Sequence, residues 1–284
     1  MAQPIAVVDA FTSEPYRGNP AGICVLPAAA SDAWMQSVAI EMNHAETAFL
    51  IKRGASNTDG YDLRWFTPGG EVDLCGHATL ASAHYLWETN ALAAEEQARF
   101  HTRSGLLTAD RILLRGTAWI ELDFPSEPVV ATAAPEGLAA MLGAEPVFVG
   151  RNRMDFLVEL KDESTVRNLR PDFQRIEAIS SQANLRGIIV TATGAGVTAT
   201  GAGAAEIVSR CFFPRFHIDE DPVTGSAHCA LAPYWIGRLG KPEIVAYQAS
   251  ARGGWLRLRL AGDRVKLRGQ AVTTLRGELA HDPH

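Results

Sequence analysis

The sequence predicts an α+β protein made of two homologous domains, each with strands wrapped around one central helix. The first observation is a repeat: GHATLASAHYLW, starting at Gly76, and GSAHCALAPYWI, starting at Gly225, agree at five of twelve positions. The second is the series of strand-like segments that flanks each copy. The copies lie roughly 150 residues apart, a period too long for a solenoid. The repeat therefore indicates two related domains.

The repeat extends upstream of both glycines. Arg-x-Phe-x-Pro occurs at residues 64–68 and again at 210–214. Proline removes a ladder donor and favours an extended residue before it, so each motif predicts the end of a strand. Seven residues connect the motif to the glycine in the first copy and ten in the second. Each glycine opens a segment with helical apolar spacing that is apolar nearly all round, which predicts a helix buried at the centre of its domain.

The remaining elements are expected from alternation and capping. A helix is expected over residues 31–43, with Ser31 as its N-cap. The proline-rich stretch 125–135 predicts the domain boundary, which gives domains 1–125 and 126–284, with a return of the last strand to the first domain left open. The expected strands are 4–11, 21–27, 45–52 and 61–66 in the first domain, and 146–151, 155–160, 187–193 and 255–260 mostly in the second.

Composition limits the class of protein. Of 284 residues, 47% are hydrophobic and 20% charged, which predicts a sizeable packed core. The formal net charge of −6 and the lack of a basic stripe argue against a nucleic-acid partner. No apolar run reaches the roughly 18 residues of a membrane span, and the first residues lack a cleavable leader pattern. Four sparse cysteines fit a reducing, cytoplasmic setting better than a disulfide scaffold.

The repeated glycines suggest a binding site. A helix N-terminus leaves backbone N–H groups unpaired and carries partial positive charge, and glycine lets a ligand approach closely. If the two domains face each other, the helix ends at Gly76 and Gly225 can hold one small carboxylate in an interdomain cleft. The alternative is that both glycines only allow tight packing of a helix under a sheet.

Five stretches carry a resemblance to a known family. They are VDAFTSEPYRGNPAGICVLP (8–27), NHAETAFL (43–50), RWFTPGGEVDLCGHATLASA (64–83), DEDPVTGSAH (219–228) and ARGGWLRLRL (251–260). Together they span essentially the whole length, and the chain resembles the phenazine-biosynthesis (PhzF-like) isomerase family, which has the diaminopimelate-epimerase fold. The resemblance implies two pseudo-twofold-related domains, each a mostly antiparallel sheet or barrel around its central helix.

The resemblance also implies the activity. A member of this family is expected to be a cofactor-free isomerase that moves a proton along a small carboxylic acid by acid/base catalysis. Homodimerisation is expected on the same ground alone. The implied catalytic residues are Glu46, His77, Asp221 and Ser226, and the implied substrate-binding residues are Asn19, Gly76 and Gly225.

Taken by themselves, the same residues allow simpler interpretations. Glu46 lies between a helix end and an apolar strand, where partial desolvation would raise its pKa, but a strand-end glutamate can also just face water. His77 can contact substrate, with its pKa lowered by the helix N-terminus, or be a solvated histidine. Asp221 precedes a proline and can serve turn chemistry. Ser226 can be a plain N-cap, a ligand contact or both.

Three other patterns were weighed. Cys75 occupies the place of one thiol of a two-cysteine epimerase, but the second repeat has no cysteine at the matching place, so a racemase with two thiols is disfavoured. Cys75, His77, His228 and Cys229 lack the ligand spacing of a zinc site. Residues 187–208 contain Gly-x-Gly-x-x-Ala, a weak nucleotide motif. They are better interpreted as a mobile hairpin, with a role as a flap over the cleft left open.

The sequence thus predicts a proton-shifting isomerase of unknown substrate. A histidine after one repeated glycine and a serine after the other make the two helix ends chemically unequal, which suits a proton shift along a substrate better than a symmetric racemisation. The alternative is a catalytically silent member of the same fold that binds a small carboxylate or a protein. Motifs alone do not fix which molecule fits.

Overall fold

The computed structural model describes residues 2–114, 116–196, 198–199, 203–281 and 283. The chain forms two compact units: Met1–Asp123 with Arg268–His284, and Phe124–Leu267. The first is called unit 1 and the second unit 2, and each is described by itself.

Unit 1 holds two α-helices among the residues described. The helices are α1 (Asp32–Met42) and α2 (Gly76–Glu88), and Asn57–Asp59 forms the short 3₁₀ helix η1. The strands are β1 (Gln3–Ala10), β2 (Asn19–Leu26), β3 (Glu46–Lys52), β4 (Tyr61–Thr67), β5 (Gly70–Val72), β6 (Ala98–Thr102), β7 (Gly105–Leu114), β8 (Thr117–Pro125) and β20 (Ala271–Leu279).

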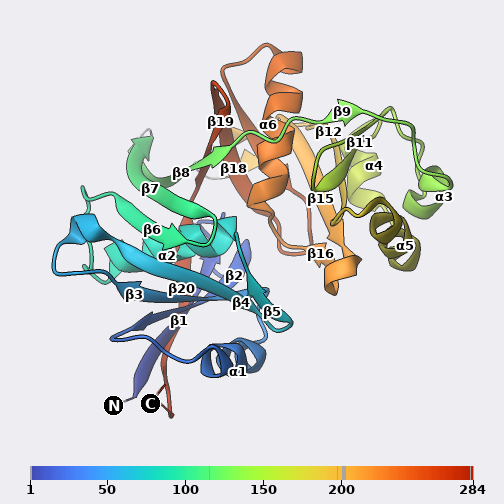
Figure 1. Cartoon of the computed structure of the whole chain (residues 1–284). Coiled ribbons are helices and arrows are strands. Elements are labelled where there is room, and N and C mark those ends of the chain that lie inside the picture. The colour runs from blue at the N-terminus through green and yellow to red at the C-terminus, as the bar shows by residue number, and fades with distance from the viewer. Residues whose placement is uncertain (1, 115, 197, 200–202, 282, 284) are drawn as a thin grey trace. The chain divides into compact units, whose positions relative to one another are not determined.

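Unit 2 has more helices between its strands (Figure 1). The helices are α3 (Leu138–Leu142), α4 (Glu163–Asn168), α5 (Phe173–Ala183), the 3₁₀ helix η2 (Pro214–Phe216) and α6 (Gly225–Leu239). The strands are β9 (Val130–Ala131), β10 (Phe148–Arg151), β11 (Asp155–Glu159), β12 (Gly187–Thr193), β13 (Thr198–Ala199), β14 (Gly203–Ala204), β15 (Ile207–Phe213), β16 (Ile218–Asp221), β17 (Glu243–Gln248), β18 (Gly254–Ala261) and β19 (Arg264–Gly269).

The two units repeat one strand topology. In unit 1, β1–β2 pair antiparallel, β2–β3 parallel, β3–β4 antiparallel, β4–β6 parallel and β6–β7 antiparallel. In unit 2 the same directions recur in β10–β11, β11–β12, β12–β15, β15–β17 and β17–β18. The first parallel pair of each unit is bridged by helices: α1 connects β2 to β3, and α4 and α5 connect β11 to β12. This order confirms the prediction of two related, mostly antiparallel α+β units.

Every strand and helix named from the sequence is present, with small shifts at the ends. The expected 31–43 helix is α1, and its predicted cap is correct: the Ser31 side chain accepts a hydrogen bond from the backbone N–H of Trp34. The Arg-x-Phe-x-Pro motifs end β4 and β15 as expected. The last strand, β20, pairs antiparallel with β1, so it lies in unit 1.

Helix α2 is the buried centre of unit 1, as its apolar sequence predicts. It packs against β1, β2, β3 and β20. Even its polar residues Thr79 and Ser82 are fully buried. Their hydroxyls donate to the carbonyls of Cys75 and Ala78, four residues back, at 2.5 and 2.7 Å. Burial without a lost hydrogen bond is possible because these carbonyls have a second lone pair.

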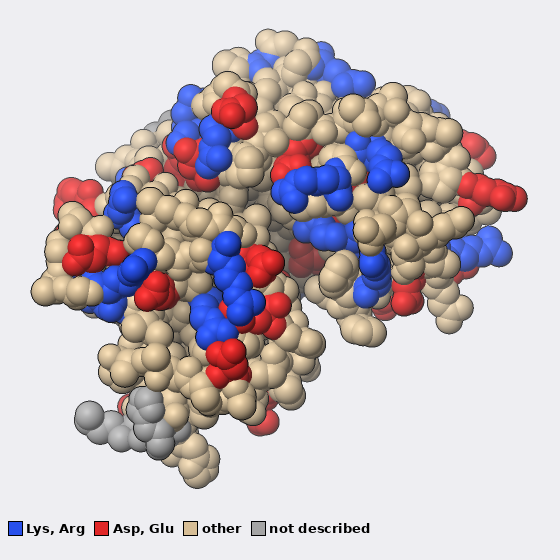
Figure 2. Space-filling model, in the orientation of Figure 1, with Lys and Arg blue, Asp and Glu red and all other residues tan. Residues whose placement is uncertain are grey.

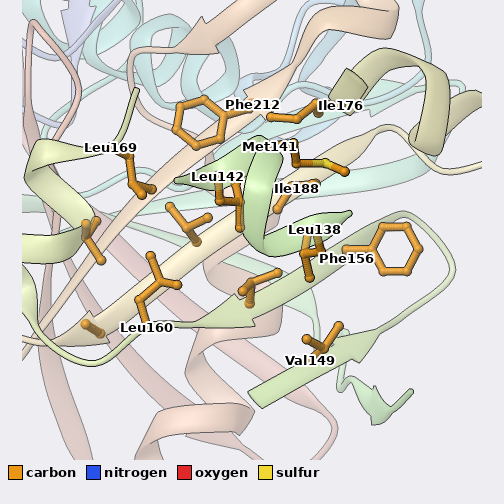
Figure 3. Packing of buried hydrophobic residues seen from close by; sticks show 14 of the residues in the cluster. Leu138, Met141, Leu142, Val149, Phe156, Leu160, Leu169, Ile176, Ile188 and Phe212 are labelled. Carbon is orange, nitrogen blue, oxygen red and sulfur yellow. The ribbon is translucent and has the colours of Figure 1, made fainter. Parts of the chain in front are cut away.

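Unit 2 has a large apolar cluster between its strands and helices α3, α4 and α5. Met141 and Leu142 of α3 and Ile176 of α5 lie against Ile188 of β12 and Phe212 of β15 (Figure 3). On the same strand β12, Thr191 accepts a hydrogen bond from the indole N–H of Trp235 in α6 at 3.0 Å. Strand β12 is therefore held from both of its faces, since successive side chains point to opposite sides.

Charges of both signs lie intermingled on the face shown in Figure 2, in keeping with the small formal net charge of −6. Within the described part of the chain, no helix combines the length and the apolarity that crossing a bilayer demands.

Gly187 begins β12 in a place that has no room for a side chain. A Cβ atom there would lie 1.9 Å from the carbonyl oxygen of Phe212, which belongs to the paired strand β15. Gly187→Ala is therefore expected to lower the free energy of unfolding by about 3 kcal/mol, because the strands would have to separate locally. Chemical denaturation of the purified variant measures this loss.

Gly237→Ala is the matched control. Gly237 is an exposed residue inside α6, and a Cβ there meets no atom within 4 Å. Alanine in a helix interior is favoured over glycine by roughly 0.5–1 kcal/mol, so this variant should be slightly more stable than the parent. Equal effects of the two substitutions would contradict the steric argument.

Candidate functional site

Glu46 is the first residue of β3 and is placed by the end of α1. Asn43 closes α1 in the left-handed conformation, with φ 50° and ψ 35°, and its N–H bonds to the carbonyl of Ala39. Only two residues then separate this turn from Glu46. Strand β3 pairs with β2 so that Glu46 lies beside Ala21. The Glu46 side chain is 15% exposed, so the alternative of a glutamate that simply faces water is wrong.

His77 is the second residue of α2 and lies against Glu46. Its Nε2 is 3.3 Å from Oε2 of Glu46, and the ring is buried. Burial lowers the pKa of His77 to about 3; the charge of His44 acts in the same direction, and a hydrogen bond to the Pro20 carbonyl opposes both. The predicted direction is correct, but burial is the main cause. At neutral pH the imidazole is therefore uncharged.

Cys75 completes this cluster. It is the N-cap of α2, with φ −144° and ψ 115°, and its Sγ lies 3.4 Å from Nδ1 of His77. One ligand atom each from Glu46, Cys75 and His77 fall within 4.8 Å of one another, so these residues could together hold a metal ion. The sequence did not predict these three residues as a metal-binding set, because Glu46 comes from a strand well upstream.

Asn19, the fourth predicted residue of unit 1, is the fully buried first residue of β2. Gly18 before it has φ +63°, and a Cβ there would lie 2.1 Å from the carbonyl oxygen of Ala10. Only glycine fits this turn, which starts β2 at Asn19. The next residue, Pro20, accepts a hydrogen bond from His77 through its carbonyl.

The two repeated helices share one feature at their start. In neither α2, whose N-cap is Cys75, nor α6, whose N-cap is Thr224, does the side chain of the N-cap residue accept a hydrogen bond from the first turn. Both helices begin at the repeated glycine. Because the N-cap side chain does not occupy the N–H groups of this turn, the start of each helix is suited to an anionic ligand.

In unit 2, Asp221 is the buried last residue of β16. Its Oδ2 accepts a short hydrogen bond from the hydroxyl of Thr224, the N-cap residue of α6. Gln248 joins both: its Nε2 donates to the Asp221 carbonyl at 2.8 Å, and its Oε1 accepts from the Thr224 N–H at 2.8 Å. Asp221 therefore organises the turn before α6, which agrees with the interpretation that it serves turn chemistry. This bond engages only one carboxylate oxygen.

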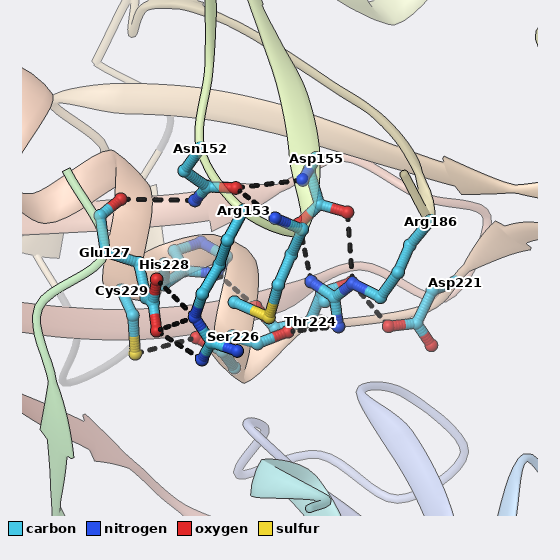
Figure 4. A network of polar contacts seen from close by, with 12 residues as sticks. Glu127, Asn152, Arg153, Asp155, Arg186, Asp221, Thr224, Ser226, His228 and Cys229 are labelled. Atoms are coloured by element: carbon cyan, nitrogen blue, oxygen red, sulfur yellow. Dashed lines mark hydrogen bonds and ion pairs between the residues drawn. The ribbon is translucent and has the colours of Figure 1, made fainter. Parts of the chain in front are cut away.

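Ser226 is the second residue of α6, and its interpretation as a plain N-cap is wrong, because Thr224 is the N-cap. The Ser226 hydroxyl instead accepts a hydrogen bond from Nη1 of Arg186 at 3.1 Å (Figure 4). Arg186 also grips the buried Asp155 with two bonds, at 3.1 and 2.5 Å. Burial raises the pKa of Asp155, and the Arg186 guanidinium opposes that rise.

Arg186 and Asp155 were missed by the sequence reasoning. Asp155 is the first residue of β11, and Arg186 directly precedes β12. These strands pair in parallel, with Asp155 beside Gly187, so the two side chains meet at the same end of the sheet. The spacing of parallel strands is a tertiary property and left no local signal.

Two further patterns from the sequence are a set of cysteines and histidines and a nucleotide motif. Cys75 and His77 lie in unit 1, whereas His228 and Cys229 lie in α6 of unit 2, where each bonds to a helix carbonyl four residues back. Gly194 to Gly196 follow β12 and do not open a helix, so the nucleotide motif lacks its setting. The expected hairpin is represented by the pair β13–β14, but residues 197 and 200–202 lie outside those described.

The sequence and the fold can be compared with those of known proteins. An uncharacterized isomerase of Halalkalibacterium halodurans is 53% identical over 280 residues, which cover 98% of this chain and 99% of the relative. A crystal structure of a PhzF-family phenazine biosynthesis protein of Enterococcus faecalis superposes with a TM-score of 0.89 at 40% identity, covering 99% of this chain and 100% of that one. The protein therefore belongs to the class of isomerases.

The family model described as phenazine biosynthesis-like protein matches residues 8–277. The chain belongs to this PhzF family, and the resemblance stated from its motifs is confirmed. A hydroxyproline epimerase of Agrobacterium vitis matches with a TM-score of 0.60 at 12% identity, covering 98% of this chain and 94% of that one. That likeness concerns the fold alone, and it agrees with the predicted α+β class.

A buried histidine makes the stability of unit 2 depend on pH. Burial lowers the pKa of His228 to about 4, against a hydrogen bond to Thr224 that favours the charged form. The unfolded chain takes up this proton near its ordinary pKa of about 6.5, so acidification between these values favours unfolding. His228→Asn keeps a donor for the Thr224 carbonyl but cannot titrate.

We expect His228→Asn to reduce the slope of unfolding free energy against pH by up to about 1.4 kcal/mol per pH unit between about pH 6 and 5. Denaturant titrations across that range measure the slope, whatever constant loss the smaller side chain causes. His281→Asn, at an exposed residue, is the control and should leave the slope unchanged. Identical slopes for the parent and His228→Asn would show that His228 is not buried and neutral.

Proposed function

We propose that this protein is a cofactor-independent isomerase that moves a proton on a small carboxylic acid, with Glu46 as the general acid and base. One observation carries the proposal: the Glu46 carboxylate lies 3.3 Å from a buried imidazole that stays neutral at physiological pH. General bases of this kind are positioned side chains that hold and release one proton within a partly dry environment.

The neutral state of His77 matters for this chemistry. A charged imidazolium at such a distance would form an ion pair with Glu46 and make the carboxylate a weaker base. A neutral ring leaves the negative charge of Glu46 available for a substrate C–H group. The ring also restricts how the carboxylate can turn, because Glu46 and His77 are held on a strand and a helix rather than on loops.

The proposed substrate class follows from the helix starts. The first N–H groups of α2, from Gly76 onward, have no side-chain cap, and the glycine permits close approach. A carboxylate is the small anion whose oxygens such amides bind. We assign this role to Gly76 and to Gly225 at the start of α6, and we assign a substrate-binding role to Asn19 as well. A proton is then removed from carbon next to, or conjugated with, the bound acid.

Asp221 and Ser226 are proposed to assist in the same reaction. Because the Ser226 oxygen accepts from Arg186, its own hydrogen is available as a donor to a substrate oxygen. Asp221 is held in place by Thr224 and Gln248. The family resemblance supports both assignments.

The wider setting is also a proposal. The Enterococcus faecalis relative is named for phenazine biosynthesis, and dihydro-hydroxyanthranilate is accordingly one candidate substrate among small unsaturated and amino carboxylates. All four cysteines are free thiols, which supports action in a reducing compartment such as the cytoplasm. A homodimer is proposed from the resemblance alone.

Glu46→Gln tests the proposal. The wild-type protein is incubated in D₂O with a panel of small unsaturated and amino carboxylates, and NMR measures the deuterium content of each compound. The wild type should introduce deuterium into one of them. The variant should exchange about 100- to 10,000-fold more slowly, because an amide cannot accept the proton. Its affinity for the same compound should stay within about threefold, since amide and carboxylate have the same shape.

Glu41→Gln, an exposed residue of α1, is the control and should exchange like the wild type. Equal loss of binding and exchange in Glu46→Gln would remove Glu46 from the role of base. A panel member that binds tightly to the wild type but never exchanges would instead favour a catalytically silent carboxylate-binding protein.

A further inference from the structure

Three side chains of different metal-binding types gather where β3 and α2 begin. They are Glu46, Cys75 and His77, and one ligand atom from each lies within 4.8 Å of the others. We propose that this cluster binds a zinc ion, with a thiolate, an imidazole nitrogen and a carboxylate oxygen as its protein ligands, and that the bound ion inhibits the protein. The cluster differs from the cysteine and histidine set considered from the sequence.

The donor chemistry selects the ion. A sulfur, a nitrogen and an oxygen ligand suit zinc, which accepts all three and is commonly held by three protein ligands with a fourth position left to water. Magnesium and calcium require oxygen ligands almost alone, so a thiol and an imidazole do not suit them. Divalent cobalt accepts the same tetrahedral set and can therefore report on it.

The spacing is close to that of a tetrahedral site. Zinc bonds of about 2.0–2.2 Å to nitrogen and oxygen place these two atoms about 3.3 Å apart across a tetrahedral angle. Nε2 of His77 and Oε2 of Glu46 are 3.3 Å apart. On the other side of the ring, Nδ1 lies 3.4 Å from Sγ of Cys75, near the roughly 3.5 Å that a sulfur and a nitrogen ligand of one zinc ion would show.

The two distances involve different nitrogens of the His77 ring, and one ligand atom from each of the three residues lies within 4.8 Å of the others. An ion can bind only one of these nitrogens, so the third ligand atom has to move by about 1 Å to join the other two. A rotation of the Cys75 or Glu46 side chain supplies this movement without a change of backbone. Glu46 is the first residue of β3, Cys75 is the N-cap of α2 and His77 lies in the first turn of α2, so little ordering is needed for binding.

Inhibition follows from the identity of the ligands. A Glu46 carboxylate bonded to an ion cannot accept a substrate proton, and this part of the inference rests on the proposed function. Metal binding itself does not, and it can be measured without any substrate.

The test is a titration of the purified, metal-free protein with Co²⁺ under reducing conditions. Wild type should develop the near-ultraviolet absorption of a cobalt–thiolate bond at one equivalent, and Zn²⁺ should abolish it. Cys75→Ala should show no such band. Cys24→Ala, which removes a buried thiol of β2 in the same unit, should keep it. Circular dichroism checks that each variant folds, and Cys75→Ser replaces Cys75→Ala if that variant does not.

Glu46→Gln should bind Zn²⁺ at least about tenfold more weakly in competition with a chromophoric chelator, because it loses one ligand. No thiolate band with wild type, a band lost equally in Cys24→Ala, or unchanged affinity in Glu46→Gln would each overturn the zinc site. Deuterium exchange measured with and without Zn²⁺ separates the two proposals. If the protein binds cobalt but exchanges deuterium into no compound, the metal site is supported and the isomerase proposal is not. If it exchanges deuterium but does not bind cobalt, the isomerase proposal is supported and the metal site is overturned.

Discussion

The burial of helix α2 is the constraint on which the candidate site in unit 1 depends. A helix surrounded by β1, β2, β3 and β20 cannot slide or rotate without breaking contacts along its whole length. Its first turn therefore opens at a fixed place beside the start of β3. Close packing of this kind explains how Glu46 and His77, which come from separate elements, are brought to 3.3 Å without any loop to hold them.

Unit 2 uses a different device at the corresponding helix. The start of α6 is fixed by charge and hydrogen bonds: Arg186 links the buried Asp155 to Ser226, and Gln248 links the N-cap residue of the helix to the end of β16. A buried ion pair tolerates little displacement, because loss of either partner leaves an uncompensated charge. Two related topologies thus hold their repeated helices by unlike means, which matches the histidine in one copy and the serine in the other.

Much of this molecule was predictable from the sequence, and the exceptions have physical causes. Strand alternation, the Ser31 cap and the repeated helix are local patterns, and all of them were found where expected. The capping role given to Ser226 was wrong because a cap depends on backbone angles, which place Thr224 there instead. Arg186 was missed because its partners are far away in sequence, and His77 is neutral through burial, which no short motif reveals.

The pairing of β20 with β1 has a consequence for synthesis. Unit 2 is one continuous stretch, Phe124–Leu267, whereas in unit 1 strand β1 has β2 on one edge but lacks its second neighbour, β20, until the residues after 267 have been made. On the ribosome, unit 2 can complete its sheet while the earlier-made part of unit 1 still waits with an open edge. Such an edge is a template for unwanted strand pairing, so the order of translation leaves the half of the protein that carries Glu46 exposed for longest.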